Sequence, residues 1–348
     1  MLLVWLKAGL YLLLLTPLIF WKPLDFFFDS TKAFFVMALS ELLFCGYIWL
    51  VRQDVRWRPK LDVITKAFLI FFGSLLIVSI FGVDLFLSFW SSTDRINGIL
   101  MWIHLVAAYF VLSNILRDQK EWNTFFSAQC IVGLCVGFIF TLTQLDRTFM
   151  PDSMGGGTLG NSTFLGAYLL FCIFFASILT MEGHRRWMRR LGLISVVTFS
   201  LLVFMTSALA AKGALLGILI LFPVLWVLFS PNSTRSKRLL CTVFITMFFF
   251  LFVLGFVQLF VPGSYVNQLF LSFTGPARLG AWQIAWSAFF DRPLFGWGLD
   301  NFPYAFAVHY IPCFGSSACG GEIWFDRAHN KVLDLLVDGG FLLFFSYM

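Results

Sequence analysis

The sequence predicts an all-α integral membrane protein with about ten transmembrane helices and a long extracytoplasmic loop that contains a short amphipathic helix. Of its 348 residues, 60% are hydrophobic and only 12% are charged. A soluble domain carries about 25% charged residues, so this chain has too few charges to cover a water-exposed surface. The hydrophobic residues also occur in runs of about 20, the length at which a helix crosses the hydrocarbon core of a membrane.

Ten apolar segments are candidate spans. Because lipid offers no hydrogen-bond partner to the backbone, each is expected to be a helix. The segments are 2–20, 31–51, 65–82, 97–116, 123–144, 161–181, 191–208, 210–229, 239–261 and 329–348. Together they predict a single polytopic membrane domain over residues 1–348. The last segment stops at Met348 without a polar residue to close it, so we expect the natural chain to continue with further helices.

The basic residues between the spans predict the orientation of the chain. Fourteen lysines and arginines lie in or beside the even-numbered loops, and eight lie in or beside the odd-numbered ones. Since cytoplasmic loops are enriched in lysine and arginine, the even loops and the N-terminus are predicted to be cytoplasmic. The long loop 262–328 is then extracytoplasmic. The same bias accounts for the net charge of +6 without a nucleic-acid partner.

Two cysteines lie in this long loop, Cys313 and Cys319, within the segment IPCFGSSACGG. A disulfide between them is the favoured interpretation, because an extracytoplasmic compartment is oxidising. A metal site is the alternative, with His309 as a further ligand nearby. Since the chain has neither zinc-ligand spacing nor a P-loop, we expect no metal and no other cofactor.

Two outer segments combine small residues with one polar or basic residue. Residues 155–168, GGGTLGNSTFLGAY, lead through Asn161 into the sixth span. Asn161 either caps that helix or stands beside free backbone amides that attract a phosphate. In TSALAAKGALLG, Lys212 stands where the chain enters the eighth span. Lys212 either extends to the membrane interface or points as a cation into an outward-facing cavity.

The segment 278–290 has the periodicity of an amphipathic helix lying on the outer face of the membrane. Arg278 begins it, Trp282 and Trp286 share one stripe, and Arg292 follows before a tight Gly-Trp-Gly turn. Tryptophan suits the headgroup level of a bilayer. Outer arginines contribute nothing to a positive-inside orientation, so phosphate binding is the natural interpretation of their presence.

Ionisable residues concentrate in FDRAHNKVLDLLVDGG, residues 325–340, at the outer end of the last span. His329 can exchange protons near neutral pH, which makes it the candidate catalytic base. Asp326 is expected to cap the helix or to orient the imidazole, and Asn330 is a candidate for binding substrate. The alternative is that these residues are only caps and ion pairs. Lys331, Asp334 and Asp338 are expected near one face of the helix, where they would stabilise it.

Two ionisable residues lie well inside apolar stretches of predicted spans, Glu41 in MALSELLFCG and His104 in MWIHLVAAYF. A charge in a span is costly and is usually paired or functional. One ionisable group in each of two helices is too few for a proton relay, so we expect interhelical hydrogen bonds.

Five segments resemble, in this order, the motifs of the O-antigen ligase and O-antigen polymerase family of bacterial multispanning membrane glycosyltransferases. They are GTLGNSTFLGAYLL, TSALAAKGALLG, ARLGAWQIAW, DRPLFGWGLDNF and FDRAHNKVLDLLVDGG. The resemblance covers most of residues 80–348. It implies that a glycan is transferred from an undecaprenyl-diphosphate carrier to an acceptor hydroxyl at the outer face of the bacterial inner (plasma) membrane, in the biosynthesis of lipopolysaccharide or another cell-surface polysaccharide.

The resemblance also implies roles for single residues. Arg278 would bind the lipid diphosphate, and His329 would act at the acceptor hydroxyl in a single displacement with inversion. Lys212-Gly213-Ala214 stands where the family commonly has Arg-Gly-Ala. Lysine keeps the charge but loses the two-pronged contact of arginine with phosphate. The implied partners are the lipid-linked glycan donor, a glycan, lipid or protein acceptor, and membrane lipids.

A secondary transporter or a lipid-linked-glycan permease is the alternative function. Transporters place broken helices and charges near the middle of the membrane and often contain internal repeats. In this sequence the polar residues gather at one membrane face instead, which favours an enzyme that works at an interface.

Overall fold

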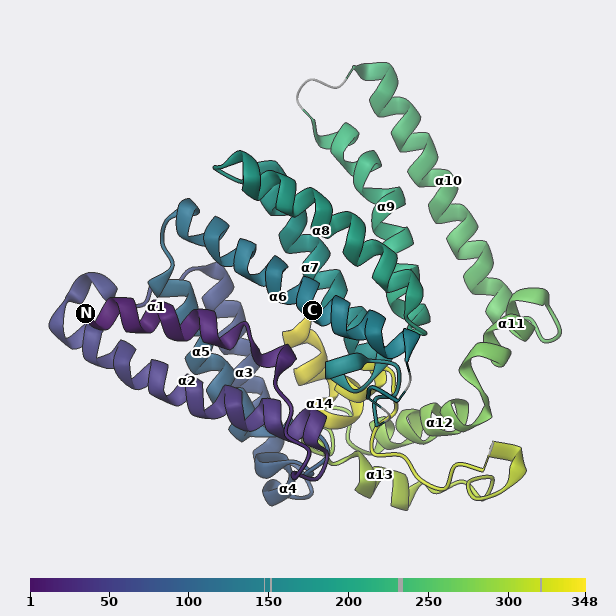
Figure 1. The fold of residues 1–348 in the computed structure, drawn as a ribbon. Coiled ribbons are helices and arrows are strands. Elements are labelled where there is room, and N and C mark those ends of the chain that lie inside the picture. The colour runs from purple at the N-terminus through teal and green to yellow at the C-terminus, as the bar shows by residue number, and fades with distance from the viewer. Residues whose placement is uncertain (147, 151, 231–233, 320) are drawn as a thin grey trace. The chain divides into compact units, whose positions relative to one another are not determined.

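The computed structural model describes residues 1–146, 148–150, 152–230, 234–319 and 321–348. Over these residues the chain forms α-helices joined by loops and short 3-10 turns, and it contains no β-strand (Figure 1). The predicted all-α class is therefore confirmed. The chain divides into two compact units: unit 1 is Met1–Leu69 and Phe89–Leu215, and unit 2 is Ile70–Ser88 and Leu216–Met348.

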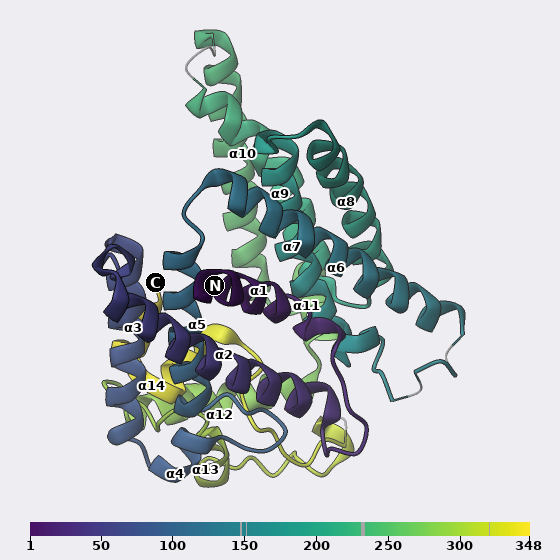
Figure 2. The same cartoon turned by 60° about the vertical axis from the view of Figure 1, so that its left-hand side comes forward.

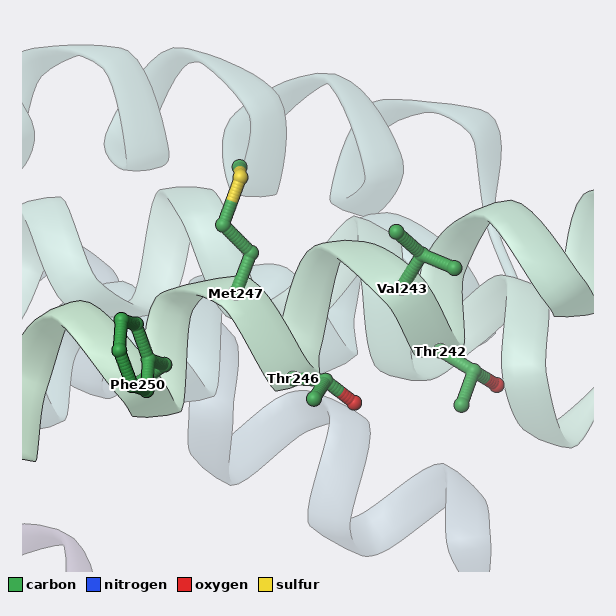
Figure 3. Close-up of a pocket in the computed structure, with 5 residues that line it drawn as sticks. All are labelled: Thr242, Val243, Thr246, Met247 and Phe250. Carbon is green, nitrogen blue, oxygen red and sulfur yellow. The ribbon is translucent and has the colours of Figure 1, made fainter.

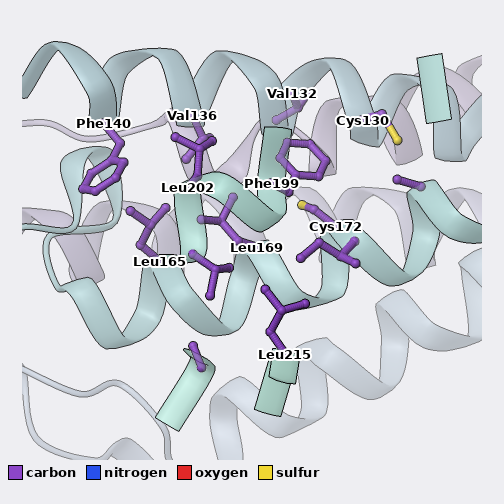
Figure 4. Close-up of a cluster of buried hydrophobic side chains, with 14 of the residues drawn as sticks. Cys130, Val132, Val136, Phe140, Leu165, Leu169, Cys172, Phe199, Leu202 and Leu215 are labelled. Carbon is purple, nitrogen blue, oxygen red and sulfur yellow. The ribbon is translucent and has the colours of Figure 1, made fainter. Parts of the chain in front are cut away.

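Unit 1 is built mainly from long apolar helices. They are α1 (Leu2–Leu13), α2 (Phe27–Gln53), α5 (Ile99–Ile115), α6 (Gln119–Leu145), α7 (Ser162–Glu182) and α8 (Arg186–Met205). Helices α6, α7 and α8 pack together around a buried apolar cluster (Figure 4). In this cluster, Phe199 of α8 lies close to Cys172 of α7 and to α6, and Phe140, Leu165 and Leu202 continue the same core. These contacts are typical of helices that pack through their apolar faces.

Glu41 and His104, the two residues singled out within apolar spans, contact each other. His104 Nε2 of α5 lies 2.8 Å from Glu41 Oε1 of α2, and His104 Nδ1 lies 2.7 Å from the Leu100 carbonyl oxygen. An interhelical hydrogen bond was predicted for each residue, and a single bond between the two residues accounts for both. This bond joins α5 to α2, and each ring nitrogen of His104 has a partner.

Unit 2 contains the residues that follow the eighth predicted span. Its helices include α10 (Arg235–Leu259), α11 (Tyr265–Thr274), α12 (Pro276–Asp291), α13 (Phe302–Val308) and α14 (Lys331–Tyr347). Helix α12 packs against α13 and α14 and covers the segment 278–290 that was predicted to be a helix (Figure 2). Its small and apolar residues Ala281, Ile284, Ala285 and Ala288 are buried, whereas Trp286 and Phe290 are exposed. The long loop 262–328 is therefore mostly structured.

Two helices have residues in both units. They are α3 (Val63–Ile80) and α9 (Leu209–Phe229). With α2, α6, α7, α8 and α10 they make seven helices, among the described residues, that are long and apolar enough to cross a membrane. The structure thus supports a multispanning protein, with fewer full-length spans than the ten predicted.

Three predicted spans are shorter or interrupted. The helix of the first predicted span, 2–20, ends at Leu13. Pro17 has no amide hydrogen to donate to the Leu13 carbonyl, so it cannot continue the helix. The Thr16 hydroxyl donates to this carbonyl instead. The fourth, 97–116, forms the 17-residue helix α5. The tenth, 329–348, is broken at Gly340, whose φ of 58° and ψ of −154° are non-helical. The sequence pattern did not reveal this break.

Candidate functional site

The histidine that the sequence selected lies at the start of α14. His329 has a φ of 52°, in the left-handed region that non-glycine residues seldom occupy. Its Nε2 atom lies 3.8 Å from Asp326 Oδ1, and its ring packs edge-on against Phe325 with centroids 5.4 Å apart. The side chain is 36% exposed, against 15% for Asp326. A half-exposed imidazole thus faces a nearly buried carboxylate.

Asn330, the next residue, is the N-cap of α14. Its side-chain oxygen accepts hydrogen bonds from the backbone amides of Val332 and Leu333, at 3.1 Å and 3.5 Å. Asn330 is therefore the N-cap of α14. Asp326, which the sequence had also allowed as the cap, does not have this role. Asparagine is among the preferred N-cap residues because its short side chain reaches these amides. Asp326 is left to contact its neighbours His329 and Arg327.

The loop before α14 is tied to two helices at Ala328. The Trp282 Nε1 group donates to the Ala328 carbonyl at 2.9 Å, and the Ala328 amide donates to Asp334 Oδ1 at 2.9 Å. Ala328 itself is fully buried. Arg278 lies four residues before Trp282 on α12, so both side chains lie on the same side of that helix. The helix side that carries Arg278 is thus the side that contacts the loop of His329.

A second loop, which contains Trp297, Gly298 and Asn301, also contacts α14. The backbone amides of Trp297 and Gly298 donate to the carbonyls of Val337 and Asp338 in α14, at 2.7 Å and 2.9 Å. The buried side chain of Asn301 accepts from the Asp84 amide and donates to the Ser88 hydroxyl. This loop is therefore fixed to α14 on one side and to residues 84–88 on the other.

Asp84 is itself held by hydrogen bonds. The Tyr304 hydroxyl donates to Asp84 Oδ2 at 2.6 Å, and the Leu87 amide donates to Oδ1 at 3.0 Å. These bonds favour the carboxylate and lower the pKa of Asp84 below its ordinary value. Asp84 thus remains ionised at neutral pH as a structural anchor of the loop.

The two arginines of the α12 segment have different surroundings. Arg278 is exposed, and no hydrogen bond or ion pair joins it to another side chain among the described residues. The Arg292 guanidinium lies over the ring of Trp297, 5.3 Å from its centroid. Arg292 also borders a surface pocket of about 270 Å³ that is lined by Phe81, Pro293, Leu294, Phe295 and Gly296.

The remaining candidates, Asn161 and Lys212, belong to unit 1. Asn161 caps α7 by accepting from the Thr163 amide at 2.8 Å. Lys212 is half-buried in the first turn of α9. The Ser207 hydroxyl donates to the Ser162 hydroxyl at 2.7 Å, which joins the segment before α9 to the start of α7. The glycine-rich motif and the Lys212 motif therefore meet within this unit.

Another pocket lies on α10 and has different chemistry. It measures about 400 Å³ and is lined by Thr242, Val243, Thr246, Met247 and Phe250 (Figure 3). This lining has no charged group, and α10 has no buried residue over its described length. An apolar surface of this kind suits lipid contact and does not suit binding of a phosphate.

Cys313 and Cys319 are joined by a disulfide with 5.3 Å between their Cα atoms. Phe314, which lies between them, and Cys319 are both buried in the apolar cluster that also contains Ala328. The disulfide thus closes a short segment that packs in the same apolar cluster as Ala328, the neighbour of His329. Within the part of the chain that the structure describes, no group of three or more His, Cys, Asp or Glu side chains is arranged to hold a metal ion.

One charged residue of the site was missed by the sequence analysis. Asp300, with a φ of 60°, follows the Gly-Trp-Gly turn, and Arg327 lies 3.7 Å from it. By sequence alone, Arg327 was one of the eight basic residues in or beside the odd-numbered loops. The available signal was the pattern Gly-Leu-Asp-Asn directly after the turn, but it does not reveal which charge Asp300 contacts.

Residues 194–348 match the family model described as O-antigen ligase. Six of the seven catalytic or substrate-binding candidates lie in this range, and Asn161 lies before it. A search of curated proteins and a search of solved structures found no match.

Proposed function

We propose that this multispanning bacterial membrane protein transfers a glycan from an undecaprenyl-diphosphate carrier to an acceptor hydroxyl, because residues 194–348 match the O-antigen ligase family model. The domain supports glycosyl transfer of the ligase or polymerase type in general, with a lipid-linked glycan and an acceptor as partners. The observation that carries the finer proposal is the half-exposed His329 facing the nearly buried Asp326. Such a pair can accept the proton of a sugar hydroxyl.

The donor diphosphate would be bound by basic side chains. Arg278 is the first candidate because it is exposed, lacks a protein partner among the described residues, and lies on the side of α12 that contacts the His329 loop. A guanidinium can bind two phosphate oxygens at once. Within the same unit, Arg292, beside its apolar pocket, would add positive charge, and Asn330 would order the start of α14. In unit 1, Lys212 and Asn161 remain proposed substrate-binding residues.

The proposed reaction is one displacement at the anomeric carbon. The acceptor hydroxyl oxygen forms a bond to this carbon, and the bond from the carbon to the diphosphate oxygen breaks, with its electron pair going to the leaving diphosphate. The hydroxyl proton passes to the imidazole of His329, and Asp326 stabilises the resulting imidazolium. Cations placed opposite the leaving oxygen stabilise the charge that develops there. A base and cations supply the required chemistry, so we propose a metal-independent reaction without a cofactor.

We place this site at the outer face of the inner membrane, with the N-terminus in the cytoplasm. The bias of basic residues toward the even-numbered loops supports this orientation. The disulfide between Cys313 and Cys319 also supports it, because structural disulfides persist in oxidising compartments. These are independent properties of the chain, and both favour an extracytoplasmic location for residues 262–328.

Replacement of the proposed base tests this function. We expect His329→Ala to lower glycan transfer by about 10²-fold or more, the size expected for loss of a general base. Asp326→Asn should cost less, because it leaves the imidazole in place. The assay is transfer from a lipid-linked donor in proteoliposomes, with membrane insertion and thermal unfolding measured for each variant.

His309 provides a matched control, since it is a second histidine of the same loop. It pairs with Asp291 of α12 at 2.6 Å. His309→Ala should keep most of the transfer activity. Near-normal turnover of folded His329→Ala would contradict the proposed base and leave the segment as a capped helix start.

A further inference from the structure

Arg327 stands beside the proposed base but contacts two carboxylates. Its Nε atom lies 3.3 Å from Asp326 Oδ2, and its Nη2 atom lies 3.7 Å from Asp300 Oδ1. Asp326 and Asp300 are each 15% exposed, and the Arg327 side chain is 28% exposed. The guanidinium therefore lies between two nearly buried negative charges, and the other Asp326 oxygen faces His329.

Asp300 is held by a loop with little freedom to move. The loop donates backbone hydrogen bonds to the Val337 and Asp338 carbonyls, and the fully buried Asn301 joins it to Asp84 and Ser88. Asp300 and His329 both adopt the left-handed backbone conformation that is costly for non-glycine residues. Such conformations persist only where the surrounding structure enforces them, and they cluster at functional sites.

We propose that Asp300 and Arg327 are positioning residues for the Asp326–His329 pair, and that Arg327 does not bind the donor diphosphate. This inference rests on the proposed function of His329. Asp300 fixes the guanidinium, the guanidinium fixes the Asp326 carboxylate, and that carboxylate orients the imidazole. The order of contacts is Asp300, Arg327, Asp326 and His329, and it joins the Gly-Trp-Gly loop to the start of α14.

Electrostatics favours this role over phosphate binding. A phosphate approaching Arg327 would have to displace or oppose two carboxylates that already neutralise the guanidinium, and like charges at short range repel. Exposed Arg278 faces no such competition among the described residues. The two arginines therefore have different roles, although both are predicted to be extracytoplasmic.

Two substitutions with opposite charge effects test the proposal. Besides Asp300, Asp326 and Arg327, the nearby charged groups are Lys331, Asp334 and Asp338 of α14. Asp334 and Asp338 both interact electrostatically with Arg327 and Lys331. Asp300→Asn removes a negative charge, which favours the neutral imidazole, so the acidic limb of the pH–rate profile should move to lower pH. Arg327→Met removes a positive charge, and the acidic limb should move to higher pH.

Both variants should also lower kcat while KM for the donor stays unchanged. The loss should reach about 10²-fold, since a displacement of about 1 Å from a productive geometry can cost this much. The double variant should lose little more than the worse single variant, because both act through one contact. Arg327→Lys keeps the charge, so it should keep the wild-type pH profile with a lower kcat. It also serves as the informative variant if Arg327→Met does not fold.

Other results would overturn the inference. A raised donor KM for Arg327→Lys or Arg327→Met, with kcat and pH profile unchanged, would make Arg327 a phosphate-binding residue. Wild-type kinetics for Asp300→Asn would remove Asp300 from the site. These outcomes do not test the proposed function itself. That test is His329→Ala, which decides whether the imidazole is the base.

Discussion

At the scale of single residues, two residues of the same type can have different roles because their surroundings differ. Arg278 and Arg327 are both arginines of the predicted outer region. Arg278 is exposed without a protein partner among the described residues, whereas Arg327 lies between Asp300 and Asp326. A guanidinium that the protein leaves unneutralised is available to a phosphate ligand. A guanidinium that already contacts two carboxylates is not available to such a ligand.

This difference predicts the behaviour of Arg278→Ala. Stability should change by no more than about 0.5 kcal/mol, because the side chain is exposed and makes no described contact. Transfer from the lipid-linked donor should fall by about 10-fold to 10²-fold, the equivalent of about 1.5–3 kcal/mol for a charged hydrogen bond. Arg278→Lys should lose much less, because it keeps the charge.

The matched control for this prediction is Gln283→Ala, an exposed change on the same helix. It should leave transfer and stability unchanged. The measurements are the apparent donor KM in proteoliposomes and thermal unfolding in detergent. Full activity of Arg278→Ala at low donor concentration would count against Arg278 as a diphosphate ligand.

At the scale of elements, the break in α14 connects the site to the loop behind it. Gly340 interrupts the helix, and the amides that follow it find partners outside: Phe341 donates to the Pro293 carbonyl and Leu342 to the Leu294 carbonyl. A side chain at Gly340 would place its Cβ 2.4 Å from the Pro293 carbonyl oxygen. The break thus allows α14 to pack closely against the segment that leads into the Gly-Trp-Gly turn, which in turn fixes Asp300.

Gly340→Ala should therefore destabilise the protein. The backbone conformation is one that only glycine adopts readily, at a cost of about 1–3 kcal/mol for other residues, and the clash adds to it. The expected result is a lower unfolding temperature together with reduced transfer. Gly255→Ala in α10 is the control, because a Cβ there meets nothing within 4 Å and the backbone is helical. Equal stability of the two variants would refute the proposed role of the break.

At the scale of the whole molecule, the seven long apolar helices describe a multispanning protein. The proposed orientation of these helices rests on the basic residues, which concentrate in the loops predicted to be cytoplasmic. Four arginines occur within residues 185–190 alone, at the start of α8. The proposed site and the disulfide lie on the opposite side in this orientation, where a lipid-linked glycan can be presented.

Cysteine labelling in intact cells measures this topology. In a variant whose free cysteines are replaced, a cysteine at Ser272, which is exposed in α11, should react with a membrane-impermeant maleimide. A cysteine at the exposed Arg185 should react only after the membrane is permeabilised. The reverse pattern would invert the proposed orientation and move the long loop 262–328 into the cytoplasm.

The sequence by itself determined the fold class, most of the membrane helices, the helix after Arg278 and the resemblance to O-antigen ligases. These properties are local or compositional: apolar runs must be helical in lipid, and a cap such as Asn161 acts on its own helix. The helix break at Gly340 is also local, but glycine permits a break without requiring one, so the pattern predicted a continuous span.

Only the tertiary structure decided which charges meet. The pairing of Arg327 with Asp300, and of Trp282 with the Ala328 carbonyl, joins segments that are separate in sequence. Periodicity and composition carry no information about such contacts, because they depend on how α12, α14 and the Gly-Trp-Gly loop pack. For this physical reason the sequence could nominate His329 as a base, while the arrangement of charges around it emerged only from the fold.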